Sequence, residues 1–136
     1  MQGRIKHKCE EIERYVEDLS GMMPRSIEEY LSDRKTRAAC ERYFEKIVEA
    51  VVDLALLCIK DRGLESPEED KQAFDILASA KVIELSLAKR LKEAKGMRNI
   101  LAHEYGQVDD ELVFKSVTDE ICRDAQEFVS AVRRLD

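Results

Sequence analysis

The sequence has no tryptophan, few glycines (five) and prolines (two), and no apolar run near the roughly 20 residues of a membrane-spanning helix. These shortages exclude collagen-like and low-complexity chains, which are rich in glycine or proline. A disordered chain is also excluded, since 44% of the 136 residues are hydrophobic. The first 19 residues carry basic side chains without a following apolar stretch. We therefore expect no signal peptide, no membrane association and a cytoplasmic protein.

Paired cysteines are also lacking, because the four cysteines lie far apart and form no Cys-x-x-Cys motif. In a reducing cytosol we expect Cys9, Cys40, Cys58 and Cys122 to be thiols, three of them buried on apolar stripes. A zinc site that includes His7 and Cys9 is the alternative, but the spacing fits no familiar zinc motif. We therefore expect core thiols, and neither a metal nor a cofactor.

The overall charge is acidic, with 23 Lys and Arg against 29 Asp and Glu and a net charge of −6. A broad nucleic-acid surface is normally basic, so this balance disfavours a non-specific nucleic-acid binder. The segment 89–98 departs from the balance, because it holds five cations and one glutamate. Besides Arg98, the cations of this local basic patch are Lys89, Arg90, Lys92 and Lys95.

Apolar residues recur at spacings of three and four, which is the period of an amphipathic helix, and not at the spacing of two typical of strands. Residues 5–19 carry one such stripe, which Ser20-Gly21 ends. Ser26 and Glu29 have the capping-box pattern of a short further helix. A long helix of about 40 Å is predicted over residues 34–62.

The later helix boundaries are predicted from caps and breakers. Ser66 and Pro67 are expected to begin a helix as its N-cap and first residue, and Gly96 is among the glycines expected to separate helical blocks. Asp109 or Asp110 is expected to begin the last helix. Its apolar stripe comprises Val113, Val117, Ile121, Ala125, Phe128, Val132 and Leu135.

These patterns together predict one all-α domain over residues 1–136, an up-and-down bundle of four or five helices. The long helix needs neighbours, and so thin a bundle can leave an apolar stripe for a second copy of itself. We therefore expect a two-fold dimer.

The candidate site lies in segment 98–106, which holds Asn99, the only asparagine of the chain. Asn99 precedes His103 by four residues, so the two share one face of a helix. Arg98 lies about 140° around the helix from His103. These two side chains can converge if the helix distorts or ends near His103, or if a second copy supplies its own pair across a two-fold axis.

These residue types suit phosphodiester chemistry. Histidine, with an ordinary pKa of about 6.5, can accept and donate a proton, and arginine binds phosphate oxygens in a fork. Asparagine can orient the imidazole or bond a phosphate oxygen. RNA cleavage at such a site would use the 2′-hydroxyl of the substrate as nucleophile and no metal ion. The structural alternative is that Arg98 and His103 merely interact with the carbonyl end of their helix.

Residues 98–105, RNILAHEY, resemble the signature of the HEPN superfamily, an arginine followed after four intervening residues by a histidine. The tyrosine two residues later is the version seen in HepT-like toxin ribonucleases. The resemblance covers nearly the whole chain. Residues 37–63 are similar to the long helix of that family, with the matching pairs Glu41-Arg42 and Ile47/Glu49. Further similar segments are residues 74–91 and 108–117.

The resemblance implies a homodimer in which two motifs face each other and form one metal-independent RNA-cleaving centre. It implies that Arg98 and His103 are catalytic, with Asn99 in support. It also implies a partner, a small MntA-like nucleotidyltransferase antitoxin that transfers AMP from ATP onto Tyr105. A phosphate ester beside Arg98 would place negative charge and bulk where the RNA phosphate must bind.

Some features disfavour a simple RNA-binding site. The acidic net charge suggests a particular RNA in a confined cleft, and Glu104 adds negative charge within the motif. The long helix carries carboxylates at spacings of four, which we expect to be mostly solvated, although one could bond Arg98 or His103. They are Glu41, Glu45, Glu49 and Asp53.

The rival hypothesis is a non-catalytic module that binds a nucleotide, or that docks the nucleotidyltransferase through segment 89–98. A third possibility is a purely structural bundle, in which the motif residues would tolerate substitution.

Overall fold

The computed structural model describes residues 2–103 and 109–135, and this part of the chain is helical without strands. The elements in chain order are α1 (Gly3–Met22), α2 (Ile27–Ser32), α3 (Arg34–Asp61), α4 (Asp70–Ser79), α5 (Leu85–His103), α6 (Asp110–Lys115), the π-helical turn η1 (Ser116–Glu120) and α7 (Ile121–Arg133). No helix among these residues is long and apolar enough to cross a membrane.

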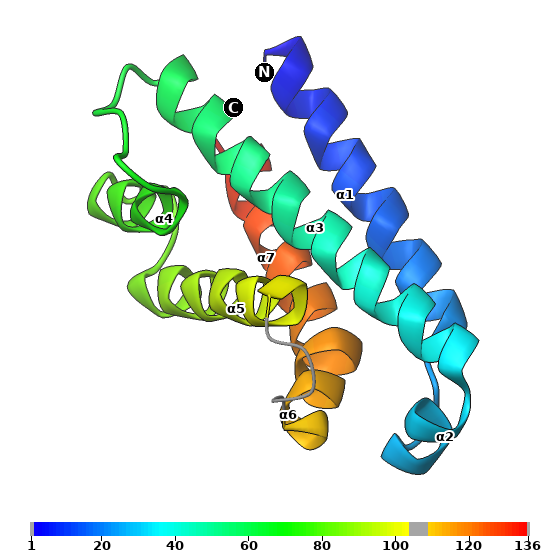
Figure 1. The fold of residues 1–136 in the computed structure, drawn as a ribbon. Helices are drawn as coiled ribbons and strands as arrows, with labels where there is room; N and C mark the ends of the chain where they lie inside the picture. The colour runs from blue at the N-terminus through cyan, green and yellow to red at the C-terminus, as the bar shows by residue number, and fades with distance from the viewer. Residues whose placement is uncertain (1, 104–108, 136) are drawn as a thin grey trace.

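Helices α1 and α3 lie side by side and antiparallel, with the short α2 at their connecting end (Figure 1). Helix α7 packs against both of them, and α4 and α5 pack against each other on one side of α3. Helix α5 crosses α3 steeply, so that its C-terminal end approaches the middle of α3 (Figure 1). This arrangement confirms the all-α helical bundle.

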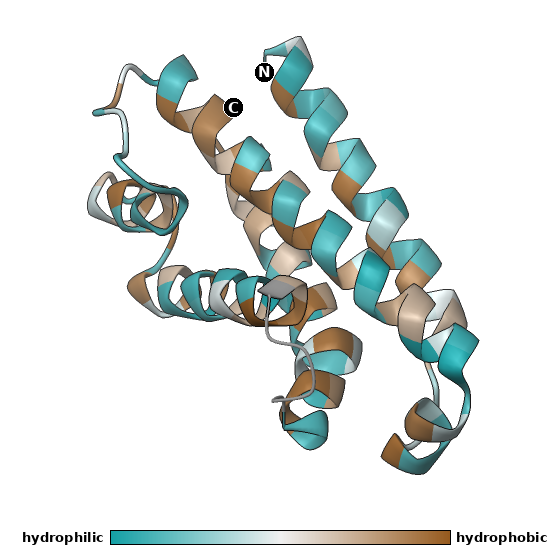
Figure 2. Cartoon of the chain, viewed as in Figure 1, coloured by the Kyte–Doolittle hydropathy of each residue, from teal (hydrophilic) through white to brown (hydrophobic). Residues whose placement is uncertain are grey.

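Helix α3 forms the centre of the core. Eleven of its 28 residues are buried, because its apolar stripe is wide enough to contact α1, α5 and α7 at once. The hydropathy of the helices follows this arrangement, with apolar faces turned toward their neighbours and polar faces outward (Figure 2). Helix α1 buries the predicted stripe of Ile5, Cys9, Ile12, Val16 and Leu19.

Side-chain caps define several helix starts, two of which the sequence predicted. Ser26 Oγ accepts a hydrogen bond from the Glu29 backbone N–H at 3.2 Å, which confirms the cap of α2. Asp33 caps α3 by accepting from the backbone of two residues. Asp109 caps α6 in the same way, which confirms the start of the last helical segment.

Two expected boundaries are wrong. Helix α4 begins at Asp70 rather than at Ser66 and Pro67, because the chain leaves α3 in an extended connection after Gly63, whose φ is +66°. Gly96 does not interrupt α5. A Cβ at position 96 would lie 3.3 Å from Lys71 Nζ, so glycine admits the close approach of this side chain from α4.

The last predicted helix contains a π-helical turn, η1, between α6 and α7. Its residues bond five positions apart, which rotates the following helix relative to the preceding one. Val113, Val117 and Ile121 follow one another at spacings of four, and on an ideal α-helix such side chains would turn gradually away from one face. The rotation at η1 keeps all three buried. The turn therefore keeps one apolar face against the core.

Candidate functional site

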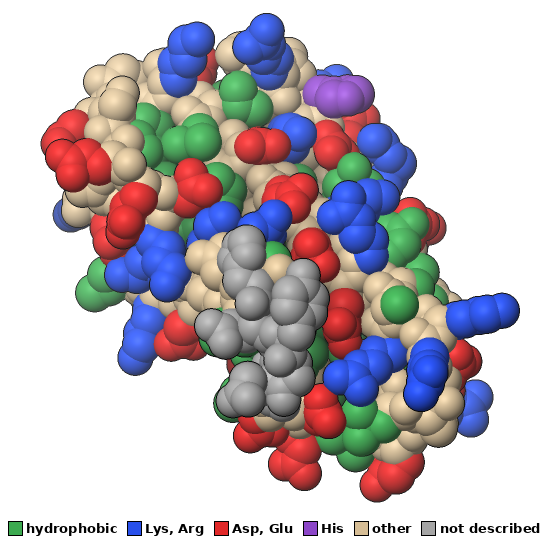
Figure 3. All heavy atoms as spheres, viewed as in Figure 1, with side chains coloured by type: hydrophobic (Ala, Val, Ile, Leu, Met, Phe, Trp, Pro, Cys, Tyr) green, Lys and Arg blue, Asp and Glu red, His purple; other side chains and the backbone are tan. Residues whose placement is uncertain are grey.

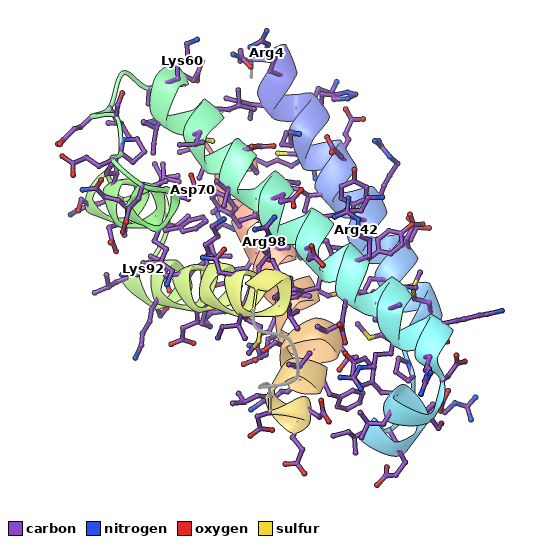
Figure 4. All side chains as sticks on the ribbon, viewed as in Figure 1. Arg4, Arg42, Lys60, Asp70, Lys92 and Arg98 are labelled. Atoms are coloured by element: carbon purple, nitrogen blue, oxygen red, sulfur yellow. The ribbon has the colours of Figure 1, made fainter. Side chains whose placement is uncertain are left out.

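The Arg98 side chain lies between α5 and α3 (Figure 4). Its Nη2 donates to Glu49 Oε1 in the middle of α3 at 2.9 Å. The Arg98 side chain is 23% exposed and that of Glu49 is 44% exposed, so the ion pair lies at the rim of the bundle. One of the four candidate carboxylates of the long helix therefore bonds the motif arginine, as the sequence had suggested.

Apart from the bond at Nη2, the Arg98 guanidinium group has no hydrogen bond to a described residue. Its Nε is buried and has no hydrogen-bond partner among the described residues. Buried polar groups are nearly always paired, because an unpaired donor forfeits its hydration. Arg98 thus has one described acceptor, at Nη2. Because Nε is closed to solvent, a further ligand can reach the guanidinium only through its other N–H groups.

The remaining motif residues are described less fully. Asn99 is half-buried on α5, and position 103 is the last residue of that helix. The His103 side chain lies outside the described part of the chain, as do Glu104 and Tyr105. The catalytic assignment of His103, the support from Asn99 and the modification of Tyr105 stay predictions.

The local basic patch is balanced by neighbouring carboxylates. Arg90 is paired with the buried Asp124 and with Glu127 of α7. The next two cations bond toward α4, where Lys92 lies 2.9 Å from Asp75 and Lys95 lies 3.3 Å from Asp70. Lys89 is exposed.

On the face shown in Figure 3, blue and red side chains alternate rather than forming a continuous basic surface. The assignment of these four cations to RNA binding stays a prediction, and the structure gives three of them acidic partners.

Sequence reasoning missed a polar network that fixes the start of α6. The Tyr30 hydroxyl donates to Glu41 at 2.6 Å, and Arg37 donates to both Glu41 and Asp110 at 3.0 Å. Burial, followed by the bond to Glu41, raises the pKa of Tyr30 far above its usual range. The network ties α2, α3 and α6 together. The sequence indicates the contact between Arg37 and Glu41, which lie four residues apart on one helix. It gives no sign of the contact between Arg37 and Asp110, which lie far apart in the chain.

The cysteines behave as core thiols. Cys9, Cys40 and Cys58 are buried, Cys122 is half-buried, and all four are free. Burial raises the pKa of Cys58 to about 12, which keeps it protonated and unreactive. His7 is exposed whereas Cys9 is buried, so these two do not form the imagined zinc site.

Comparison with known proteins identifies the class to which this fold and motif belong. The family described as "Ribonuclease HepT-like" matches residues 5–132, and the chain belongs to this family.

Two curated relatives carry related names. A "tRNA nuclease HepT" of Aphanizomenon flos-aquae is 29% identical over 119 residues, which cover 84% of this chain and 78% of the relative. A "Putative RNase" of Archaeoglobus fulgidus is 31% identical over 128 residues, covering 90% and 96%.

The fold is also that of solved toxin structures. A tri-AMPylated HEPN toxin of Shewanella oneidensis, solved in complex with an MNT antitoxin, matches with a TM-score of 0.89. The match covers 98% of this chain and 99% of that one at 22% identity, and it shows the shared fold. A second toxin–antitoxin structure, with AMP-PNP, matches with a TM-score of 0.85 at 21% identity.

Proposed function

We propose that this protein is the toxin of a toxin–antitoxin pair, an endoribonuclease that cleaves RNA without a metal ion. The observation that carries the proposal is the placement of Arg98 in the C-terminal part of α5, against α3, in a HepT-like chain. Its guanidinium is held by a single described carboxylate, and its Nε is unpaired among the described residues. The related nucleases support the reaction class, and tRNA and mRNA are the candidate substrates.

In the proposed reaction, His103 accepts the proton of the RNA 2′-hydroxyl as its oxygen attacks the adjacent phosphorus. The bond from phosphorus to the 5′-oxygen breaks, and that oxygen takes up a proton from water as it leaves, while the protonated His103 returns its proton to the solvent. The products are a 2′,3′-cyclic phosphate and a 5′-hydroxyl end. Arg98 donates to the phosphate oxygens, whose negative charge increases in the transition state. Asn99 orients the imidazole or bonds a phosphate oxygen.

The proposed centre is composite. Positions 98 and 103 lie on different sides of α5, because five residues correspond to about 140° of rotation. Two copies of the chain related by a two-fold axis would bring an arginine from one protomer to the histidine of the other. A homodimer is therefore part of the proposal. Sedimentation at micromolar concentration should give twice the chain mass, and a monomer would contradict the composite centre.

The proposed regulator is an MntA-like nucleotidyltransferase antitoxin. The Tyr105 oxygen attacks the α-phosphorus of ATP, pyrophosphate leaves, and AMP remains on the tyrosine as a phosphate ester. The added phosphate would occupy Arg98 and repel RNA. The AMPylated toxin in the Shewanella oneidensis complex supports this mode of control. The cytoplasm, where RNA and ATP both occur, is the compartment that this proposal requires.

The second candidate is a non-catalytic module that docks the nucleotidyltransferase. The balanced charge of segment 89–98 favours it, because Arg90, Lys92 and Lys95 have acidic partners and attract RNA less strongly. Such a module would bind its partner without cleaving RNA.

Cleavage of total RNA in the presence of EDTA separates the two candidates. Wild-type protein should produce fragments with cyclic phosphate ends, and His103→Ala should produce none. The chain offers a matched control, because its other histidine, His7, is exposed on α1, and His7→Ala should retain full activity. Intact RNA after incubation with wild-type protein would favour the docking module.

Intact mass after co-expression with the nucleotidyltransferase tests the regulation. The wild type should gain whole AMP units, and Tyr105→Phe should gain none. Tyr43→Phe is the matched control, since Tyr43 is a half-buried tyrosine of α3 that donates to Asp18, away from α5. Equal gains in the wild type and Tyr105→Phe would place the modification elsewhere.

A further inference from the structure

Four carboxylates lie one turn apart along α3, and each has a different cationic partner. Glu41 accepts from Arg37, and Glu45 lies 3.8 Å from Arg42, both within α3. Asp53 lies 3.7 Å from Lys8 of α1. Among the described residues, Glu49 is the member of this row that reaches across to α5, where it accepts from Arg98.

This ion pair adds little to the stability of the fold. Both side chains are partly exposed, and such pairs contribute about 0–1 kcal/mol because water screens them and because ordering long side chains costs entropy. The bond has a larger effect on the orientation of the guanidinium. Arg98 has no other described acceptor, so without Glu49 no described hydrogen bond would fix the plane of its guanidinium group.

We propose that Glu49 is a positioning residue, which holds Arg98 in the orientation needed to stabilise the transition state of RNA cleavage. This inference rests on the proposed ribonuclease function. Because the guanidinium is planar, a bond at Nη2 fixes the plane and thereby the direction of its remaining N–H groups. The carboxylate also carries negative charge beside the incoming phosphate.

The same contact should therefore have two opposing effects on the reaction. Orientation favours the transition state and raises kcat. The negative charge of Glu49 weakens ground-state binding of the RNA phosphate, which raises KM. Removing the charge should lower kcat and KM together, a combination that simple damage to the fold does not produce.

The variant Glu49→Gln keeps the size of the side chain and removes its charge. With a fluorescent single-stranded RNA in EDTA, we expect kcat to fall about tenfold and KM to fall about threefold. Glu49→Asp keeps the charge on a shorter side chain. Its kcat should lie between those of Glu49→Gln and the wild type, and its KM should be close to the wild-type value. Binding of an RNA whose 2′-hydroxyls are methylated should tighten about threefold in Glu49→Gln by the same reasoning.

Two neighbours in the row provide matched controls. Glu45→Gln and Asp53→Asn each remove one negative charge, one turn before or after Glu49, without touching Arg98. Both should leave kcat unchanged within twofold. Thermal melts should show all three charge-removing variants folded, because each loses a partly exposed ion pair.

The inference is overturned if Glu49→Gln matches the wild type, if its kcat rises, or if KM increases as kcat falls. An inactive Arg98→Ala together with an unaffected Glu49→Gln would remove Glu49 from the mechanism and leave the ribonuclease intact. A wild-type protein that cleaves no RNA would overturn the proposed function and this inference with it.

Discussion

Arg90 and Arg98 lie two helical turns apart on α5, yet their surroundings differ sharply. Arg90 faces α7, where it donates to the buried Asp124 and, at 3.0 and 3.4 Å, to both oxygens of Glu127. Arg98 faces α3, donates to Glu49, and has a buried Nε without a described partner. Among the described residues Arg90 makes three hydrogen bonds to two carboxylates, whereas Arg98 makes one hydrogen bond to one carboxylate.

This difference separates a structural role from a candidate functional one. A guanidinium surrounded by carboxylates has few free donors and holds two helices together. A partly exposed guanidinium with a single carboxylate partner can turn its outer N–H groups to an incoming phosphate without first breaking a network. The sequence placed both residues in one basic segment, because composition does not show which cations face acidic neighbours.

The largest effect on stability is expected for Arg90→Ala. The substitution leaves Asp124 as a buried carboxylate without its main cation, and the free energy of unfolding should fall by about 2–3 kcal/mol. Urea denaturation measures this loss. Arg123→Ala is the control, because the more exposed Arg123 lies 3.4 Å from the same carboxylate and should cost less than about 1 kcal/mol. Equal losses in both variants would contradict the structural role of Arg90.

Replacing both partners of the buried pair sharpens the test. In Arg90→Met with Asp124→Leu no buried charge is left without its partner, because Glu127 and Arg123, which lose a partner, are partly exposed. We therefore expect the double variant to recover at least half of the stability lost by Arg90→Met alone. The four proteins of a double-mutant cycle, compared by urea denaturation, give the coupling energy. Strictly additive losses would mean that Arg90 and Asp124 do not act as a pair.

A third arginine forms an ion pair that is more exposed than the Arg90–Asp124 pair, and its loss should reduce stability less. Arg133 of α7 donates to both oxygens of Glu13 on α1, at 2.5 and 2.7 Å, and this bond lowers the pKa of Glu13. A carboxyl group whose pKa is lower in the folded protein than in the unfolded chain stabilises the fold at pH values above its unfolded pKa of about 4.3. This stabilisation is lost as the pH falls through the pKa of the folded protein.

Glu13→Gln should therefore lower stability by about 0.5 kcal/mol at neutral pH and by nothing at a pH low enough to protonate Glu13 in the folded protein. Urea denaturation across this pH range measures the difference. A loss that persists unchanged at the acidic end would assign the effect to packing rather than to charge.

Helix positions and burial were largely predictable because they follow from local patterns. The stripe of α1, the Ser26 and Asp109 caps and the long α3 all agree with the structure. The turn at position 81 could not be predicted from a local pattern. Lys81 adopts a positive φ of 62° between α4 and α5, where the sequence offers no glycine to mark the turn.

The π-helical turn has a signal in the sequence. The stripe Val113, Val117, Ile121 and Ala125 has three consecutive spacings of four, which an ideal α-helix cannot keep on one face. A wider turn between α6 and α7 corrects the drift. Gly96 was expected to separate helical blocks but lies inside α5, where the end of the Lys71 side chain approaches it.

The candidate site was predictable in its residue types but not in its contacts. The motif identified Arg98, and the row of carboxylates on α3 suggested an acidic partner. The selection of Glu49 from that row depends on how α5 crosses α3, a tertiary feature that no local pattern encodes.

The most direct test of this account is the cleavage of a fluorescent single-stranded RNA in EDTA by Arg98→Ala, beside Arg90→Ala at a temperature where both are fully folded. We expect Arg98→Ala to cleave about 10³-fold more slowly than the wild type while keeping its thermal midpoint within a few degrees. Arg90→Ala should cleave within a few-fold of the wild-type rate. Wild-type activity in Arg98→Ala, or an equal loss in both variants, would contradict the division between a structural arginine bonded to two carboxylates and an available catalytic one.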